Sequence, residues 1–82
     1  MKVTVNISLK EGVLDPQGRA VERSLASIGF TEASNVRIGK QITLNVDVED
    51  AARAHQRAAR MCEQILANTV IEDYEITVEE DQ

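Results

Sequence analysis

The sequence predicts an α+β domain in which two helices alternate with four strands. Three segments show the strict alternation of apolar and polar residues that is typical of strands with one buried face. Two other segments have apolar residues at helical spacing, with capping residues at their ends. Because one alternating segment is interrupted by Gly-Lys, we count it as two strands, which gives the order β-α-β-β-α-β. This order predicts the ferredoxin-like arrangement, a four-stranded antiparallel sheet with both helices on one face.

The first strand is predicted from Val3, Val5, Ile7 and Leu9, which alternate with polar residues from Lys2 to Lys10. All four apolar side chains then lie on one face of the sheet, because successive side chains of a strand point to opposite faces.

The first helix is predicted over about Pro16–Ile28. Asp15 is a capping residue, and Pro16 suits the first helical position, where its missing N–H costs nothing. Val21, Leu25 and Ile28 recur at i, i+4 and i+7 and form one apolar stripe. Gly29 is the residue expected just past the helix end.

A hairpin is predicted in the middle of the chain, with Gly39-Lys40 as its tight connection. Val36 and Ile38 alternate before the connection, and apolar residues alternate after it from Ile42 to Val48. Its two halves are the second and third strands of the predicted sheet.

The second helix is predicted from Asp50, its cap, to about Leu66, and the fourth strand over about Ile71–Glu79. Asn68, just after the helix, is interpreted as a C-terminal cap with left-handed backbone. The opposite sheet face is expected to be polar and to carry Thr4, Asn6, Ser8, Thr43, Asn45, Asp47, Glu75 and Thr77.

Length and composition predict a single domain over residues 1–82. We expect self-association to stabilise its small core further. An 82-residue chain buries a small core, and such cores are often stabilised by disulfides, metals or oligomerisation. With one cysteine and one histidine, neither an internal disulfide nor the usual metal cage is expected. The lone cysteine and the absence of an apolar signal or membrane-spanning segment predict a reducing, cytoplasmic setting. The net charge of −5, with six acidic and no basic residues from Ile71 onward, argues against nucleic-acid binding.

The residues predict no catalytic site in this chain. His55 and Cys62 lie seven residues apart on one helix, about 10 Å along its axis, too far for a nucleophile–base pair. His55 is expected to be half-buried and Cys62 to be a core residue. Glu72 and Asp73 point to opposite faces of a strand and cannot converge on one substrate atom. The stripe of Arg53, Arg57 and Arg60 is either a solvent face or a docking ridge for an acidic surface.

Three strings carry a family resemblance: GVLDPQG at residues 12–18, VRIGK at 36–40 and LANTVIEDYE at 66–75. In this order and spacing they resemble the PurS family, the small subunit of phosphoribosylformylglycinamidine synthase. The resemblance covers about Val3 to Val78. One departure is Asn68-Thr69, where the family often has Asn-Pro before Val-Ile-Glu-Asp.

The resemblance implies a non-catalytic subunit of an ATP-dependent, glutamine-using carbon–nitrogen ligase of purine biosynthesis. In this family the small subunit bridges a synthetase and a glutaminase subunit and supports ammonia transfer. ATP and magnesium are then expected on the synthetase subunit, with no cofactor in this chain. The implied partners are these two subunits and further copies of the chain, as a homodimer or a dimer of dimers, with no nucleic acid or membrane. The alternative is a free-standing, ligand-binding regulatory module on the same fold.

Five residues are the candidates for partner contact: Gln17, Gly18, Arg37, Lys40 and Glu72. They lie in the three family strings, and the predicted fold gives them no core or capping role, so their identity points to a role in recognition. Gly18 is the most informative of them, because glycine in the first turn of a helix costs about 1 kcal/mol against alanine. This glycine indicates one of two things: another backbone or a ligand comes close to it, or the helix tolerates a residue of low helix propensity there.

Overall fold

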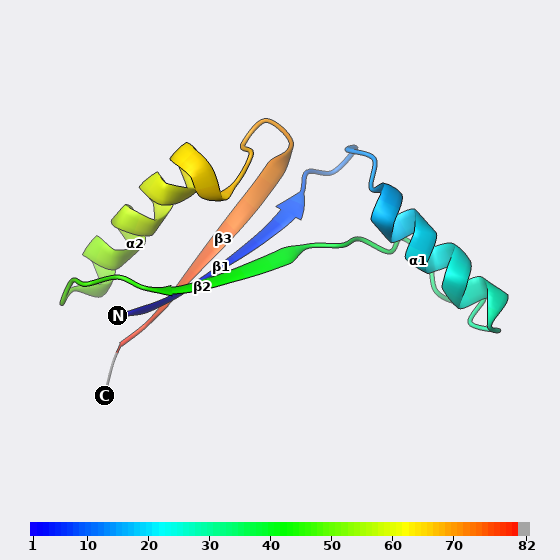
Figure 1. Cartoon of the computed structure of the whole chain (residues 1–82), viewed down its shortest axis with the longest axis horizontal. Helices are drawn as coiled ribbons and strands as arrows, with labels where there is room; N and C mark the ends of the chain where they lie inside the picture. Colours follow the sequence, from blue (N-terminus) through cyan, green and yellow to red (C-terminus); the bar gives the residue numbers. More distant parts are fainter. Residues whose placement is uncertain (81–82) are drawn as a thin grey trace.

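The computed structural model of the chain, drawn in Figure 1, describes residues 1–80. Its elements in chain order are β1 (Lys2–Leu9), α1 (Pro16–Ser27), β2 (Lys40–Asn45), α2 (Ala51–Met61), the π-helical turn η1 (Cys62–Leu66) and β3 (Glu72–Glu79). The strands form one antiparallel sheet in the order β2-β1-β3, so β1 is central.

The core lies between this sheet and α2. Val5 of β1 is flanked by Ile42 of β2 and Ile76 of β3, so the apolar positions of the three strands share one face. α2 covers that face with Ala54 and Ala58, whose small side chains allow a close approach and are fully buried. The buried hydrophobic residues are Val3, Val5, Ile7, Val46, Ala54, Ala58, Cys62 and Ala67.

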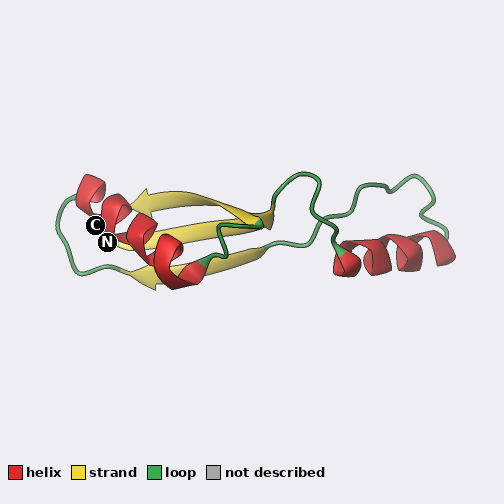
Figure 2. Cartoon of the chain, turned by 90° about the horizontal axis from the view of Figure 1, so that it is seen from above, coloured by secondary structure: helices red, strands yellow, loops and turns green. Residues whose placement is uncertain are grey.

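The other face of the sheet is polar, as predicted. Thr4 lies between Thr43 and Thr77, and the next outward residue of β1, Asn6, lies between Gln41 and Glu75. The side chain of Gln41 donates a hydrogen bond to Oδ1 of Asn6 at 2.9 Å. No helix of the described chain covers this face (Figure 2).

Both ends of α1 follow the sequence prediction. The Asp15 carboxylate accepts a hydrogen bond from the backbone N–H of Gly18, and Pro16 opens the helix. At the other end Gly29 has a φ of 105°, and its N–H bonds to the carbonyl of Ala26. The N–H of Phe30 bonds to the carbonyl of Leu25, which completes a Schellman motif.

The position of α1 contradicts the prediction that both helices cover one sheet face. Figures 1 and 2 show α1 beyond the end of the sheet, while α2 alone packs on it. The chain measures 49 × 30 × 14 Å, with a radius of gyration of 16.2 Å. A compact domain of 82 residues has about 12 Å. We call residues 10–39 the arm: α1 together with the two segments that join it to β1 and β2.

The predicted four-stranded sheet is also wrong, because residues 1–80 form a sheet of three strands. Val36 and Ile38 alternate like strand residues, but their backbone N–H groups bond to side chains of the helical region. The carboxylate of Glu22 accepts from Val36, and that of Asp15 accepts from Ile38. With these donors engaged, the segment adds no strand to the sheet. Gly39-Lys40 is therefore not a hairpin turn, and the chain runs on into β2. The order is β-α-β-α-β.

The second helical region matches the prediction in extent but not in form. Asp50 caps α2 by accepting from the N–H of Ala52, as expected. After Met61 the helix widens into η1, where the N–H of Ala67 bonds to the carbonyl of Cys62, five residues back. Within residues 1–80, none of the helices has the length and apolar character needed to cross a membrane.

Candidate protein-docking interface

The five candidate residues gather where the arm leaves the sheet. Gly18 lies in the first turn of α1, Arg37 lies on the returning segment of the arm, and Lys40 opens β2. Glu72 opens β3, two strands away from Lys40 in the sheet. Three stretches that are distant in sequence therefore meet at one end of the sheet, as their shared family resemblance suggested.

Asp15 is the central residue of this junction. Its exposed fraction is only 4%, and its two carboxylate oxygens accept from Gly18 N at 2.8 Å and Ile38 N at 2.7 Å. The hydrogen bond from Ile38 is the main reason that the pKa of Asp15 lies below its usual value, and the bond from Gly18 adds to it. The positive charge of Arg37 also lowers this pKa, while burial opposes the change. The ionised carboxylate thus joins the start of α1 to the returning segment.

Gly18 has a packing reason to be glycine. A Cβ at this position would overlap the carbonyl oxygen of Val36 and lie 3.0 Å from Cγ of Asp15. The close backbone approach inferred from the sequence is therefore present, and the approaching backbone belongs to the same chain. Gly39 is similar, because a Cβ there would lie 2.9 Å from the carbonyl oxygen of Ile7.

Arg37 ties the two connecting segments of the arm together. Its guanidinium donates to the carbonyl oxygen of Val13 at 2.8 Å and to that of Lys10 at 3.3 Å. The expectation that Arg37 and Gly18 lack a folding role is therefore wrong. Both residues hold the arm in its extended form, together with Asp15.

Lys40 and Glu72 face each other across the end of the sheet. The Lys40 Nζ lies 3.8 Å from Oε2 of Glu72. The other oxygen of Glu72 accepts from the N–H of Asn68 at 2.7 Å, so Glu72 also fixes the turn before β3. Asn68 has no left-handed backbone, contrary to its predicted capping geometry; its side chain accepts from Val70 N instead. Glu72 therefore has a local structural role as well.

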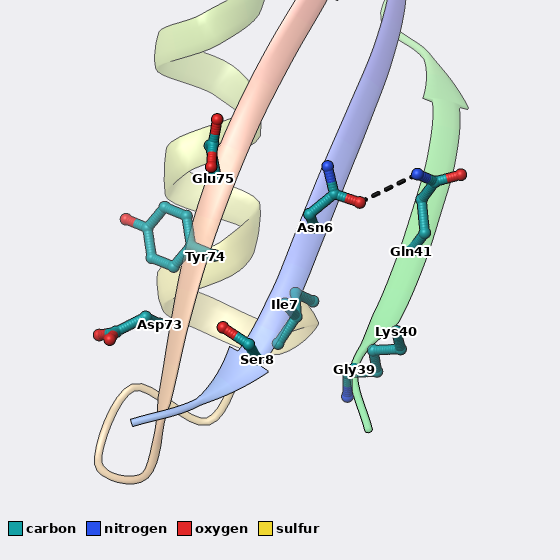
Figure 3. Close-up of a pocket in the computed structure, with 9 residues that line it drawn as sticks. All are labelled: Asn6, Ile7, Ser8, Gly39, Lys40, Gln41, Asp73, Tyr74 and Glu75. Carbon is teal, nitrogen blue, oxygen red and sulfur yellow. Dashed lines mark hydrogen bonds between the residues drawn. The ribbon is translucent and has the colours of Figure 1, made fainter. Parts of the chain in front are cut away.

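Two hollows adjoin the junction and give it a surface that another molecule can enter. One, of about 260 Å³, is lined among others by Gln17, Lys40 and Glu72. The second, of about 450 Å³, lies at the same end of the sheet and is drawn in Figure 3. Its walls include the bonded pair of Asn6 and Gln41, with acidic side chains of β3 on the far side. Gln17 is exposed, so its polar amide is open to a partner.

The other residues considered for a catalytic, metal-binding or docking role do not lie together. Cys62 is fully buried, and burial raises the pKa of its thiol, as expected for a core cysteine. His55 is exposed rather than half-buried. In the part of the chain that the structure describes, no three His, Cys, Asp or Glu side chains are grouped so as to hold a metal ion. The three arginines of α2 are exposed, so both interpretations of that stripe remain.

Two further contacts were also not predicted from the sequence. The second oxygen of Asp15 bonds to Ile38, 23 residues further along, and nothing local to Asp15 signals that partner. The hydroxyl of Tyr74 on β3 donates to Oε1 of Glu63 at 2.7 Å, which links the sheet to η1. This hydrogen bond is the main reason that the pKa of Tyr74 is raised, and burial adds to it.

Fold and junction together define a small α+β domain whose distinctive residues hold an arm away from the sheet. Residues 2–80 match the model of the family PurS, Phosphoribosylformylglycinamidine (FGAM) synthase. The chain is 51% identical over 79 residues to the "Phosphoribosylformylglycinamidine synthase subunit PurS" of Bacillus subtilis, with 96% of this chain and 93% of that protein aligned. The chain belongs to the PurS family.

Solved structures agree with this assignment. The crystal structure of PurS from Methanocaldococcus jannaschii superposes with a TM-score of 0.90 at 41% identity, covering 99% of this chain and 98% of the other. A chain in the structure of PurLQS from Thermotoga maritima gives a TM-score of 0.84 at 32% identity, with 93% of both chains covered. The three-stranded fold with its extended arm thus aligns with nearly the whole length of these relatives.

Proposed function

We propose that this chain is the non-catalytic small subunit of phosphoribosylformylglycinamidine synthase, and that it bridges the synthetase and glutaminase subunits. The observation that carries the proposal is the family match over residues 2–80. It is supported by the alignment, over 93% of the chain, with a chain from the structure of PurLQS from Thermotoga maritima. In this role the subunit supports the transfer of glutamine-derived ammonia, while ATP and magnesium bind to the synthetase subunit.

The absence of catalytic residues is part of this proposal. Among the described residues, the sole cysteine is buried in the core and the sole histidine is exposed on α2. The buried carboxylate of Asp15 already accepts two backbone hydrogen bonds. These features support a subunit that acts by holding other subunits in place, in the cytoplasm where purine synthesis occurs.

The partner surface in this proposal is the junction that carries Gln17, Gly18, Arg37, Lys40 and Glu72. The shape of this surface depends on Asp15, Gly18 and Arg37. Its exposed polar groups belong to Gln17 and Lys40. A positive charge that becomes buried against a partner is costly to remove from one side of the interface. Lys40 is the residue best suited to test this surface, because its ammonium group lies 3.8 Å from Glu72 and its side chain is 55% exposed.

The test compares Lys40→Ala with Lys2→Ala, which removes the same charge at the opposite end of the sheet. Each variant is mixed with the synthetase and glutaminase subunits, and the glutamine-dependent and ammonia-dependent rates are measured. Lys40→Ala is expected to lower only the glutamine-dependent rate, and Lys2→Ala to leave both rates unchanged. Both melting temperatures are expected to stay close to that of the original chain, because exposed charges contribute about 0–1 kcal/mol. Equal rates for the two variants would exclude the junction as the docking surface.

Self-association as a homodimer or a dimer of dimers belongs to the same proposal. The sheet leaves both β2 and β3 as edge strands, and the core that it forms with α2 is small. Sedimentation at micromolar concentration is expected to give at least a dimer, and a monomer would contradict this part of the proposal.

A further inference from the structure

The turn between η1 and β3 holds an apolar side chain in solvent. Val70 in this turn is 81% exposed, and no large hydrophobic residue of the described chain is more exposed. Hydrogen bonds centred on Asn68 fix the turn: its carbonyl oxygen accepts from the N–H groups of Ile71 and Glu72. Its side chain accepts from the N–H of Val70, and its own N–H donates to the Glu72 carboxylate. An apolar side chain on a rigid turn loses little conformational freedom on binding, which favours contact with another molecule.

A second side chain with 81% exposure, Ile65, belongs to η1. The apolar face of α2 continues at helical spacing through Ala54, Ala58, Met61 and Ile65. Ala54 and Ala58 are fully buried on the sheet, yet Ile65 lies in solvent. The wider turn of η1 rotates Ile65 off this face, and Ala67 is the residue that returns to the core. The backbone thus sets the exposure of Ile65, and short π-helical turns are frequent at functional sites.

A hollow of about 330 Å³ joins η1 to the turn before β3. Its walls are formed by Lys10, Glu63, Thr69, Glu72, Asp73 and Tyr74. Three carboxylates against one ammonium group leave an excess of negative charge in it. Glu63 accepts from the Tyr74 hydroxyl at 2.7 Å, whereas the Asp73 side chain has no ion pair or hydrogen bond among the described residues. The hollow is therefore suited to a cation.

We propose that Ile65, Val70 and this acidic hollow form a second docking surface of the chain, which we call the turn surface. Its occupant is a protein segment that places a large apolar side chain beside an Arg or Lys. The apolar side chain packs on Ile65 and Val70, as apolar anchors do at the centre of an interface. The cation enters the hollow, where Asp73 offers a free carboxylate and Glu63 and Glu72 add negative charge.

This inference rests on the proposed function and extends it. A chain that bridges two subunits needs a surface for each of them, and the junction supplies one. The turn surface is distinct from the junction but adjoins it, because Glu72 lines a hollow of each. Figure 1 shows η1 and the turn before β3 at the end of the sheet from which the arm leaves. The occupant is therefore a segment of the synthase subunit that does not dock at the junction.

The first experiment identifies the occupant in the assembled enzyme. A photoreactive benzophenone amino acid replaces Ile65 in one preparation and Lys40 in another, and each is irradiated with the synthetase and glutaminase subunits present. We expect the product from position 65 to contain one of these subunits and the product from position 40 to contain the other. The control replaces His55, which is exposed on α2, and should give at least ten-fold less product. The same subunit in both products, a second copy of this chain at position 65, or no more product there than at position 55 would overturn the proposal.

The second experiment measures the contribution of the apolar pair. Ile65→Asp and Val70→Asp each place a charge on the turn surface, and Gln56→Asp places the same charge on an exposed position of α2. Because both apolar side chains are exposed, all three variants are expected to keep the circular dichroism of the original chain. The chain concentration that gives half the maximal glutamine-dependent rate should rise about ten-fold or more for the first two variants only. Equal values for all three variants would refute the turn surface.

The third experiment tests the charge of the hollow. Asp73→Asn is compared with Asp47→Asn, which removes the same charge from an exposed position beyond the end of β2. We expect Asp73→Asn to raise the half-saturating concentration about three-fold at low salt and less at high salt, because salt screens the attraction that the variant lacks. The same effect from Asp47→Asn would exclude a cation in the hollow. If the original chain itself leaves the glutamine-dependent rate unchanged, the proposed function fails, whereas a response that none of the variants alters counts against the turn surface alone.

Discussion

Gly18→Ala is the substitution that separates a tolerated helix glycine from a required one. In an ordinary helix this change stabilises the protein by about 1 kcal/mol, because alanine has the higher helix propensity. In this chain the new Cβ meets the backbone carbonyl of Val36 and lies 3.0 Å from Cγ of Asp15. Neither group is the free end of a flexible side chain, so the start of α1 or the returning segment must move.

The magnitude follows from these two opposing effects. Added volume at a closely packed site costs typically about 1–3 kcal/mol, and an overlap with backbone belongs at the upper end of that range. Subtracting the gain in helix propensity leaves a net loss of about 2 kcal/mol in the free energy of unfolding. For a domain of this size that loss lowers Tm by about 10 °C.

The assay is thermal unfolding at one fixed protein concentration, because the self-association that we propose would make Tm depend on concentration. Ser24→Ala is the matched control: Ser24 lies on the exposed side of the same helix, and alanine there should raise stability by roughly 0.5 kcal/mol or less. A Gly18→Ala variant as stable as the original chain would show that the junction does not require glycine, and would refute this account of the arm.

Three further predictions concern the junction and its surroundings. Gly39→Ala should also lower Tm, with circular dichroism reporting intact helices, because its Cβ would lie 2.9 Å from the carbonyl oxygen of Ile7; an unchanged Tm would contradict the close approach. Asp15 has a lowered pKa, so its contribution to stability is present above its usual pKa and is lost as the pH falls through the lowered value. Urea unfolding should therefore show Asp15→Asn less stable than the original chain at about pH 6, with the gap closing below about pH 4; a constant gap would exclude the carboxylate as its cause. Tyr74 is the only tyrosine, so the absorbance of its phenolate on alkaline titration reports its raised pKa directly. Glu63→Gln should lower that pKa and Glu49→Gln should not; equal pKa values in the two variants would argue against the Tyr74–Glu63 hydrogen bond.

The elements that depend on local chemistry were predictable from the sequence. The alternation of Val3, Val5 and Ile7 with polar residues predicts β1, and all three are buried. The caps of α1 and α2 at Asp15 and Asp50 were predictable because the residues they bond are two or three positions away. Capping and alternation act within a few residues, and a single sequence contains that information.

The second predicted strand, at Val36 and Ile38, does not form, and the reason is not local to that segment. Val36 and Ile38 have the pattern of a strand, but the carboxylates of Glu22 and Asp15 take the hydrogen bonds that a strand would need. Those partners are 14 and 23 residues away. Likewise, the stripe of α1 indicates that the helix needs a cover, but periodicity does not identify which surface provides it.

The five candidate residues do lie together at one junction, but the reason for selecting them was partly incorrect. Gly18 and Arg37 were selected because they lacked a role in the predicted fold, whereas the structure gives them roles in shaping the arm. Since the arm itself was not predicted, those roles were not predictable either. That these residues also contact partner subunits stays a prediction.

The most direct test of the central claim is a reconstitution of the synthase with and without this chain. The synthetase and glutaminase subunits are mixed at fixed concentration, the chain is added in steps, and the rate is measured once with glutamine and once with ammonium as the nitrogen source. We predict that the glutamine-dependent rate rises with added chain and then saturates at a fixed ratio, while the ammonia-dependent rate changes little. A glutamine-dependent rate that does not respond to the chain, or an ammonia-dependent rate that rises in parallel with it, would contradict its role as a bridging subunit.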